Sequence, residues 1–174
     1  YMSGMWAYTQ GSAHIAQNAF SQTREHLTGL EAFVELSRKD AGQAGETPNA
    51  RILELAALSL RGELLEATGD LDGAIKAFET GVALEDLNNY TEPPDWPQPL
   101  RHYLGAALLK ANRAADAEAV YRRDLQWNHN NGWSLLGLQQ ELLAQGKTAA
   151  ANIVKADFDT AWQYSNITLE RSPL

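Results

Sequence analysis

The few side chains with the chemistry of a reactive site fall on segments that we predict to be helical. Glu63 and Glu66 are three residues apart, which places both carboxylates on one face of a helix, and His102 is expected at a comparable height on a neighbouring helix. Two carboxylates and an imidazole are ligands for a divalent metal, and paired carboxylates also serve in glycoside hydrolysis. Because acidic pairs at this spacing are common on solvated helix faces, and a lone histidine is usually structural, we predict no metal and no cofactor here.

The motifs of the common catalytic classes are absent from the sequence. It contains neither a G-x-S-x-G nucleophile turn nor a glycine-rich phosphate loop. It has no cysteine, which excludes disulfides, thiolate metal sites and thiol nucleophiles, while both oxidising and reducing compartments stay open. We therefore predict that the chain is not an enzyme.

Charge and hydropathy narrow the classes of partner. The 174 residues carry 14 Lys+Arg against 22 Asp+Glu, a net charge of -8 that disfavours nucleic acid and anionic lipid and favours neutral or cationic partners. No apolar run approaches the length of about 18 residues that a membrane span needs, so we predict no membrane insertion. Because the chain begins at Tyr1 instead of Met, we expect it to be part of a longer protein.

Hydrophobic residues recur with a period near 3.6, which predicts helices throughout the chain and no strands. Gly69, Asn112 and Gly146 each end an apolar helical segment, Asp70 is placed to cap the next helix, and Pro48 suits a first helical turn. We expect one domain over residues 1–174 that consists of four antiparallel helical hairpins. Their predicted ranges are about 3–38, 49–85, 98–127 and 131–163.

The connection at residues 88–97 is longer and stiffer than the others. Asn112 and Gly146 are 34 residues apart, whereas Gly69 and Asn112 are 43 apart, so about nine residues are inserted into the repeat. The insertion contains three prolines and Trp96. We expect Trp96 to anchor this loop, either by simple packing on the helices or by folding it over a binding groove.

Two segments share a spacing of a small residue, a second small residue and a large ring, which allows two helices to interlock. The sets are Gly62, Ala74 and Phe78, and then Gly105, Ala117 and Tyr121. These residues resemble the tetratricopeptide repeat (TPR), most clearly over residues 50–146, and the chain is similar to the C-terminal portion of longer bacterial TPR proteins.

The outer repeats match the TPR pattern less well. In the last one, either Gly137 or Gln139 takes the place of the first small residue, so two registers stay open. In the first one, Gly11 matches, whereas Thr23 and Leu27 only approximate the later positions.

The resemblance implies an all-α, right-handed α-solenoid of about four TPR-like hairpins whose first helices line a concave groove. Its function would be that of a non-catalytic protein-protein interaction or scaffolding module that binds a neutral or cationic segment of a protein or peptide, since the Lys, Arg and Asn clamp used on acidic tails is missing. The resemblance places these residues in the partner-binding groove: Tyr8, Ser12, Ser59, Glu63, Glu66, His102, Ala106, Trp133, Leu136 and Gln140.

Three alternatives stay open at this point. Tyr8 and Trp133 can be packing residues between hairpins instead of partner contacts. The chain can also be an accessory domain of a larger enzyme or metal-binding protein whose chemistry lies outside it. Finally, the apolar face of the terminal helix, with Phe158 and Trp162, can be covered by the tail or by a second copy in self-association.

Overall fold

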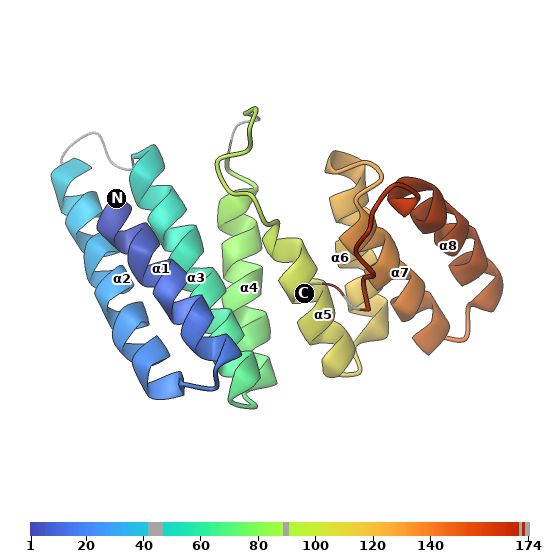
Figure 1. Cartoon of the computed structure of the whole chain (residues 1–174), viewed down its shortest axis with the longest axis horizontal. Helices are drawn as coiled ribbons and strands as arrows, with labels where there is room; N and C mark the ends of the chain where they lie inside the picture. The colour runs from blue at the N-terminus through green and yellow to red at the C-terminus, as the bar shows by residue number, and fades with distance from the viewer. Residues whose placement is uncertain (42–46, 89–90, 171, 173–174) are drawn as a thin grey trace. The chain divides into compact units, whose positions relative to one another are not determined.

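The computed structural model describes residues 1–41, 47–88, 91–170 and 172. All regular secondary structure in these residues is α-helical, and none of these helices is long and apolar enough to cross a membrane. Along the described chain there are eight helices (Figure 1): α1 Met2–Ala16, α2 Phe20–Ala41, α3 Pro48–Ala67, α4 Leu71–Glu85, α5 Leu100–Lys110, α6 Ala114–Trp127, α7 Gly132–Ala144 and α8 Thr148–Trp162.

The helices divide into two compact units, Tyr1–Pro97 and Gln98–Leu174. The first unit contains α1 to α4 and the second α5 to α8, and consecutive helices pair as hairpins within each unit. The helix pairs α1–α2, α3–α4, α5–α6 and α7–α8 span residues 2–41, 48–85, 100–127 and 132–162, where hairpins were predicted at about 3–38, 49–85, 98–127 and 131–163. That both units form a single domain over residues 1–174 stays a prediction.

The predicted turn residues adopt the conformations that their chemistry suggests. Gly69, Asn112 and Gly146 all have positive φ, at 91°, 58° and 71°, so each ends its helix in the left-handed region. The Asp70 side chain accepts a hydrogen bond from the Gly73 backbone N–H at 2.9 Å and so caps α4. These short connections force the paired helices to run antiparallel.

The small and large residues of the repeat interlock as predicted. A Cβ atom on Gly62 would overlap the ring of Phe78, and one on Gly105 would overlap the ring of Tyr121. Tyr121 also meets Gly137 of the following hairpin, so one ring fills the space beside two glycines. Both rings are almost completely buried, which makes these contacts the centre of each unit.

The first hairpin achieves the same packing with different residues. Thr23 is fully buried, and its hydroxyl donates to the carbonyl oxygens of Gly11 and Ala19 at 3.3 Å. Leu27 is buried as well, and Gly11 receives the side chain of Leu60 from α3. A polar residue is tolerated at position 23 because its hydroxyl is satisfied by the backbone.

Candidate functional site

Four of the predicted groove residues meet between α1 and α3 in the first unit. Tyr8 and Ser12 come from α1, and Ser59 and Glu63 come from α3. The Ser59 hydroxyl donates to Glu63 Oε1 at 2.9 Å, and Ser59 is fully buried. Burial, assisted by the Glu63 charge, raises the pKa of Tyr8 to about 12, although the nearby Ser59 and Ser12 hydroxyls offset part of this effect.

Glu63 is the most perturbed carboxyl group of this cluster. Burial raises its pKa to about 7, the hydrogen bond from Ser59 works in the opposite direction, and the neighbouring charge of Glu66 raises the pKa further. Glu66 lies half-buried one turn along α3. Near neutral pH, Glu63 is therefore divided between its neutral and ionised forms, and a cation bound beside it would favour the carboxylate.

Trp96 of the inserted loop packs on one member of this cluster, Tyr8. Trp96 is only 5% exposed, and its ring meets that of Tyr8 edge to face, with centroids 5.4 Å apart at 63°. The prediction that Trp96 anchors the loop on the helices is thus confirmed. Trp96 Nε1 and Ser12 Oγ are buried with no hydrogen-bond partner among the described residues.

In the second unit, four aromatic rings from three helices form a continuous row. The His102 ring of α5 stacks on Trp133 of α7, with centroids 6.4 Å apart at 17°. Trp133 then meets Trp162 of α8 edge to face at 5.2 Å, and Trp162 stacks on Phe158 at 5.9 Å. Trp133 therefore packs between hairpins, and His102 is 5% exposed.

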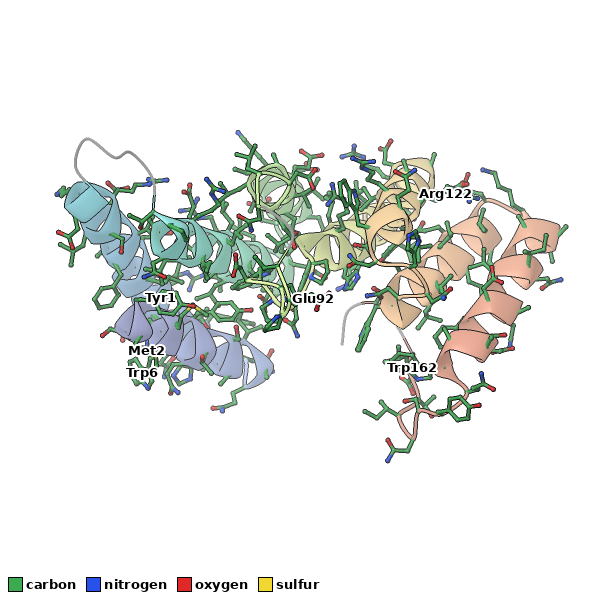
Figure 2. All side chains as sticks on the ribbon, turned by 90° about the horizontal axis from the view of Figure 1, so that it is seen from above. Tyr1, Met2, Trp6, Glu92, Arg122 and Trp162 are labelled. Atoms are coloured by element: carbon green, nitrogen blue, oxygen red, sulfur yellow. The ribbon has the colours of Figure 1, made fainter. Side chains whose placement is uncertain are left out.

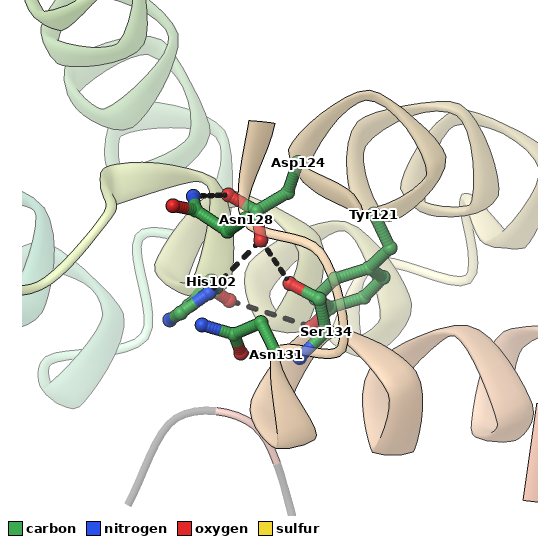
Figure 3. A network of polar contacts seen from close by, with 6 residues as sticks. All are labelled: His102, Tyr121, Asp124, Asn128, Asn131 and Ser134. Atoms are coloured by element: carbon green, nitrogen blue, oxygen red, sulfur yellow. Dashed lines mark hydrogen bonds and ion pairs between the residues drawn. The ribbon is translucent and has the colours of Figure 1, made fainter. Parts of the chain in front are cut away.

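His102 also belongs to a buried polar network centred on Asp124 of α6 (Figure 3). His102 Nε2 lies 3.3 Å from Asp124 Oδ2, and the Ser134 hydroxyl donates to the same oxygen at 2.5 Å. Asn128 donates to Asp124 Oδ1 at 2.9 Å. Burial raises the pKa of Asp124, but the interactions with His102, Ser134 and Asn128 outweigh it and leave that pKa below its usual value.

This network differs from a nucleophilic triad in the order of its members. Asp124 stands between Ser134 and His102, and the serine hydroxyl donates to the carboxylate instead of the imidazole. The carboxylate that accepts this proton has a lowered pKa, which makes it a weak base, and Ser134 is fully buried. The arrangement therefore holds α5, α6 and α7 together and does not activate Ser134.

Asp124, the centre of this network, was not among the predicted site residues. An aspartate on an amphipathic helix reads as a solvent-facing residue, and its partners on α5 and α7 are distant in the sequence. Asn128, one turn later, is the sole local signal, because an amide at that spacing can donate to the carboxylate.

The remaining predicted residues lie on α5 and α7. Ala106 is half-buried on α5, and Leu136 is buried on α7. Gln140 of α7 donates through Nε2 to the backbone oxygen of Glu170 at 2.9 Å. A residue that we predicted to contact a partner thus contacts the C-terminal tail of the chain.

The tail is fixed at a second point by Trp162. The Trp162 Nε1–H donates to the Ile167 backbone oxygen at 2.7 Å, and Figure 2 shows Trp162 beside the turn that leads from α8 into the tail. Leu169 of the tail is buried, with 7% of its surface exposed. The tail therefore contacts Trp162 of α8, and self-association through this helix stays a prediction.

The three residues considered as metal ligands lie in different units. Glu63 and Glu66 are on α3 of the first unit, whereas His102 is on α5 of the second and faces Asp124. Over residues 1–41, 47–88, 91–170 and 172, no group of three histidine, aspartate or glutamate side chains could hold a metal ion.

A separate hollow of about 370 Å³ lies between α2 and α3. Its arginines are paired with glutamates of its own lining: Arg38 with Glu35 and with Glu54 at 2.5 Å, and Arg61 with Glu31 at 2.6 Å. These exposed pairs contribute little to stability, and the three glutamates and two arginines of the lining leave the hollow with one negative charge in excess.

The similarity of this chain to known proteins lies in its fold. No protein-family model matches the sequence, and no curated protein sequence matches it. The crystal structure of MamA protein is similar with a TM-score of 0.54 at 14% identity, covering 96% of this chain and 97% of that chain. A structure of MamA AMB-1 is similar with a TM-score of 0.52 at 15% identity, covering 92% of this chain and 99% of that chain. MamA is a TPR-like helical repeat protein, and the chain therefore has an all-α helical repeat fold of TPR type.

Proposed function

We propose that this chain is a non-catalytic protein-interaction module that binds an extended, neutral or cationic segment along the first helices of its hairpins. Each unit offers a surface of its own, formed by the groove residues of α1 and α3 in the first unit and by those of α5 and α7 in the second. The helical repeat fold supports this proposal, because such repeats present side chains of successive first helices along one face.

One observation carries the proposal: Gln140, at a predicted groove position, already binds the backbone of an extended segment. The segment is the tail of the chain itself, held through the Glu170 carbonyl oxygen. Backbone carbonyl oxygens are common to all peptides, so the same donor suits a segment of another protein.

The charge of the surface supports a neutral or cationic partner. Glu63 and Glu66 lie together on α3, and the whole chain has a net charge of -8. A cationic side chain beside Glu63 would stabilise the carboxylate, whose pKa of about 7 reflects the cost of its burial. Binding of a cationic segment at α3 should therefore strengthen as the pH rises through about 7.

Selection of peptides from a random library on the full chain tests the proposal. Peptides selected on the native chain are then measured by fluorescence anisotropy against Glu63→Gln and Gln140→Ala chains. We expect at least one of these variants to weaken binding about fivefold or more, as the loss of one hydrogen bond or charge contact implies.

Gln126→Ala is a matched control for Gln140→Ala, because Gln126 is exposed on α6 and its side chain accepts a hydrogen bond from exposed Arg123. It should leave peptide binding unchanged. Equal affinities for the native chain and both groove variants, or the failure to select any peptide, would count against the proposed surface.

A further inference from the structure

We infer that α7 and α8 form a binding site for an extended segment of another protein that has a leucine anchor and no net charge, and that the C-terminal tail is its built-in competitor. This inference rests on the proposed function and names the partner class of the second unit. The contacts that bind the tail to α7 and α8 support this inference.

The tail is recognised mainly through its backbone. Residues 163–170 contain no helix or strand. Trp162 Nε1–H donates to the Ile167 carbonyl oxygen at 2.7 Å, and Gln140 Nε2–H donates to the Glu170 carbonyl oxygen at 2.9 Å. Two donors from different helices thus bind main-chain carbonyl oxygens, which every peptide has whatever its side chains.

One side chain of the tail supplies selectivity. Leu169 is 7% exposed, whereas Ile167, two residues earlier, is 57% exposed although the two side chains have the same composition. Burial of an aliphatic side chain is favourable in proportion to the area removed from water. The site therefore takes a leucine at one position and leaves its neighbour free.

The site coincides with a stripe on α7 formed by Trp133, Leu136 and Gln140, which are spaced at i, i+3 and i+7. Trp133 meets Trp162 edge to face, so the two donors that hold the tail lie at Gln140 of the stripe and at Trp162 beside its other end. The stripe consists of the residues that we predicted to contact a partner.

The charge of the tail defines the charge of the partner segment. Residues 165–172, SNITLERS, contain one glutamate and one arginine and so have no net charge. In a chain of net charge -8, a neutral segment is accepted without the repulsion that an acidic one would meet. We therefore assign an uncharged, leucine-bearing segment to this site.

The tail competes because it is tethered. A short linker holds a tethered ligand at an effective concentration of about millimolar, so a free segment displaces it only when it is present at a still higher concentration, when it binds more tightly, or when the tail is weakened. The tail is joined directly to α8 through residues 163–166. Two hydrogen bonds to its backbone and the burial of the Leu169 side chain keep it bound. So few contacts allow the tail to dissociate and bind again.

The test uses the full chain and a fluorescent peptide with the sequence of residues 165–172. Leu169→Asp should release the tail and strengthen peptide binding at least about tenfold in anisotropy titrations, because it removes the buried anchor. Ile167→Asp is the matched control: it introduces the same charge at an exposed aliphatic residue and should leave the affinity near that of the native chain.

Two further variants locate the peptide. In the Leu169→Asp chain, Gln140→Ala and Trp162→Phe each remove one donor, and each should weaken peptide binding about fivefold. Equal binding by the Leu169→Asp and Ile167→Asp chains, or no effect of either donor variant, would overturn the inference.

If the Leu169→Asp chain loses its helical circular dichroism signal, displacement of the tail is tested instead by hydrogen exchange of the native chain. Excess unlabelled peptide should then speed exchange of the backbone amides of residues 168–170, and unchanged exchange would refute the inference.

A native chain that dimerises with concentration while Leu169→Asp stays monomeric would instead identify a second copy as the occupant. Library peptides that bind without competition from the tail peptide would refute the inference alone, whereas the absence of any binder would refute the proposed function too.

Discussion

Gly62 of α3 and Phe78 of α4 fit together so closely that a Cβ atom at position 62 would overlap the phenyl ring. Phe78 is fully buried, so its ring has no free space into which it can move. The absence of a side chain on one helix thus allows a large ring on the next. This contact sets the separation of the two helices in their hairpin.

Gly62→Ala should lower the free energy of unfolding by about 1–3 kcal/mol, because overpacking displaces either the ring or the backbone. Urea unfolding followed by circular dichroism measures the change. Gly29→Ala is the control: Gly29 lies within α2 with open space around its Cα, so alanine there should raise stability by about 0.5–1 kcal/mol. We expect the free energy of unfolding to fall in Gly62→Ala and to rise in Gly29→Ala. Equal changes in the two variants would contradict the close packing of Gly62 against Phe78.

Asp124→Asn should destabilise the second unit by about 1.5–3 kcal/mol at pH 7, because the amide cannot accept the full set of bonds from His102, Ser134 and Asn128. The lowered pKa of Asp124 means that its contribution is present above its unfolded pKa and is lost as the pH falls through its folded pKa. The difference between native and variant chains should therefore shrink in acid. Unfolding measured at pH 7 and pH 3, with exposed Asp159→Asn as a control, checks this trend.

Glu141→Gln should stabilise the protein at alkaline pH. Glu141 is fully buried on α7 with both carboxyl oxygens unpaired among the described residues, and burial, with a smaller contribution from Glu118, raises its pKa to about 8. Since the folded state holds this proton more tightly, native stability should decline from about pH 4.5 to about pH 8 on account of this group.

The neutral amide at position 141 removes that decline. Urea unfolding at pH 5 and pH 9 should therefore show a larger gain from Glu141→Gln at pH 9. Glu25→Gln, an exposed change on α2, should show no such difference between the two pH values. A constant effect of Glu141→Gln across this range would show that the carboxyl group is not the source.

Trp96→Ala should lower the pKa of Tyr8 from about 12 toward its ordinary value, because it exposes a phenol that Trp96 now covers. NMR titration of isotope-labelled tyrosine follows this group directly. The same change should cost about 3–5 kcal/mol of stability through the cavity that it leaves. Trp127→Ala, at a residue 65% exposed, should change neither quantity.

The sequence by itself determined the helices and their ends. Turn residues such as Gly69, Asn112 and Gly146 act locally, through backbone conformations that L side chains rarely adopt, so their positions predict where helices stop. The 3.6-residue period likewise fixes which residues share a face of α1 or α7. The TPR resemblance placed Tyr8, Ser12, Ser59 and Glu63 on one surface, and these four residues lie together between α1 and α3.

Only the tertiary structure decided what covers each face and which polar groups are buried. Asp124 and Glu141 look like surface residues of amphipathic helices, yet Asp124 accepts hydrogen bonds from several donors, whereas the Glu141 carboxyl oxygens have no hydrogen-bond partner in the described part of the chain. Trp96 lies on Tyr8, and the tail lies at Gln140, because chain segments distant in sequence compete for the same apolar surface. The 3.6-residue period cannot predict which segment covers a given surface. That depends on the total area buried and on the donors and acceptors that neighbouring elements supply in the folded chain.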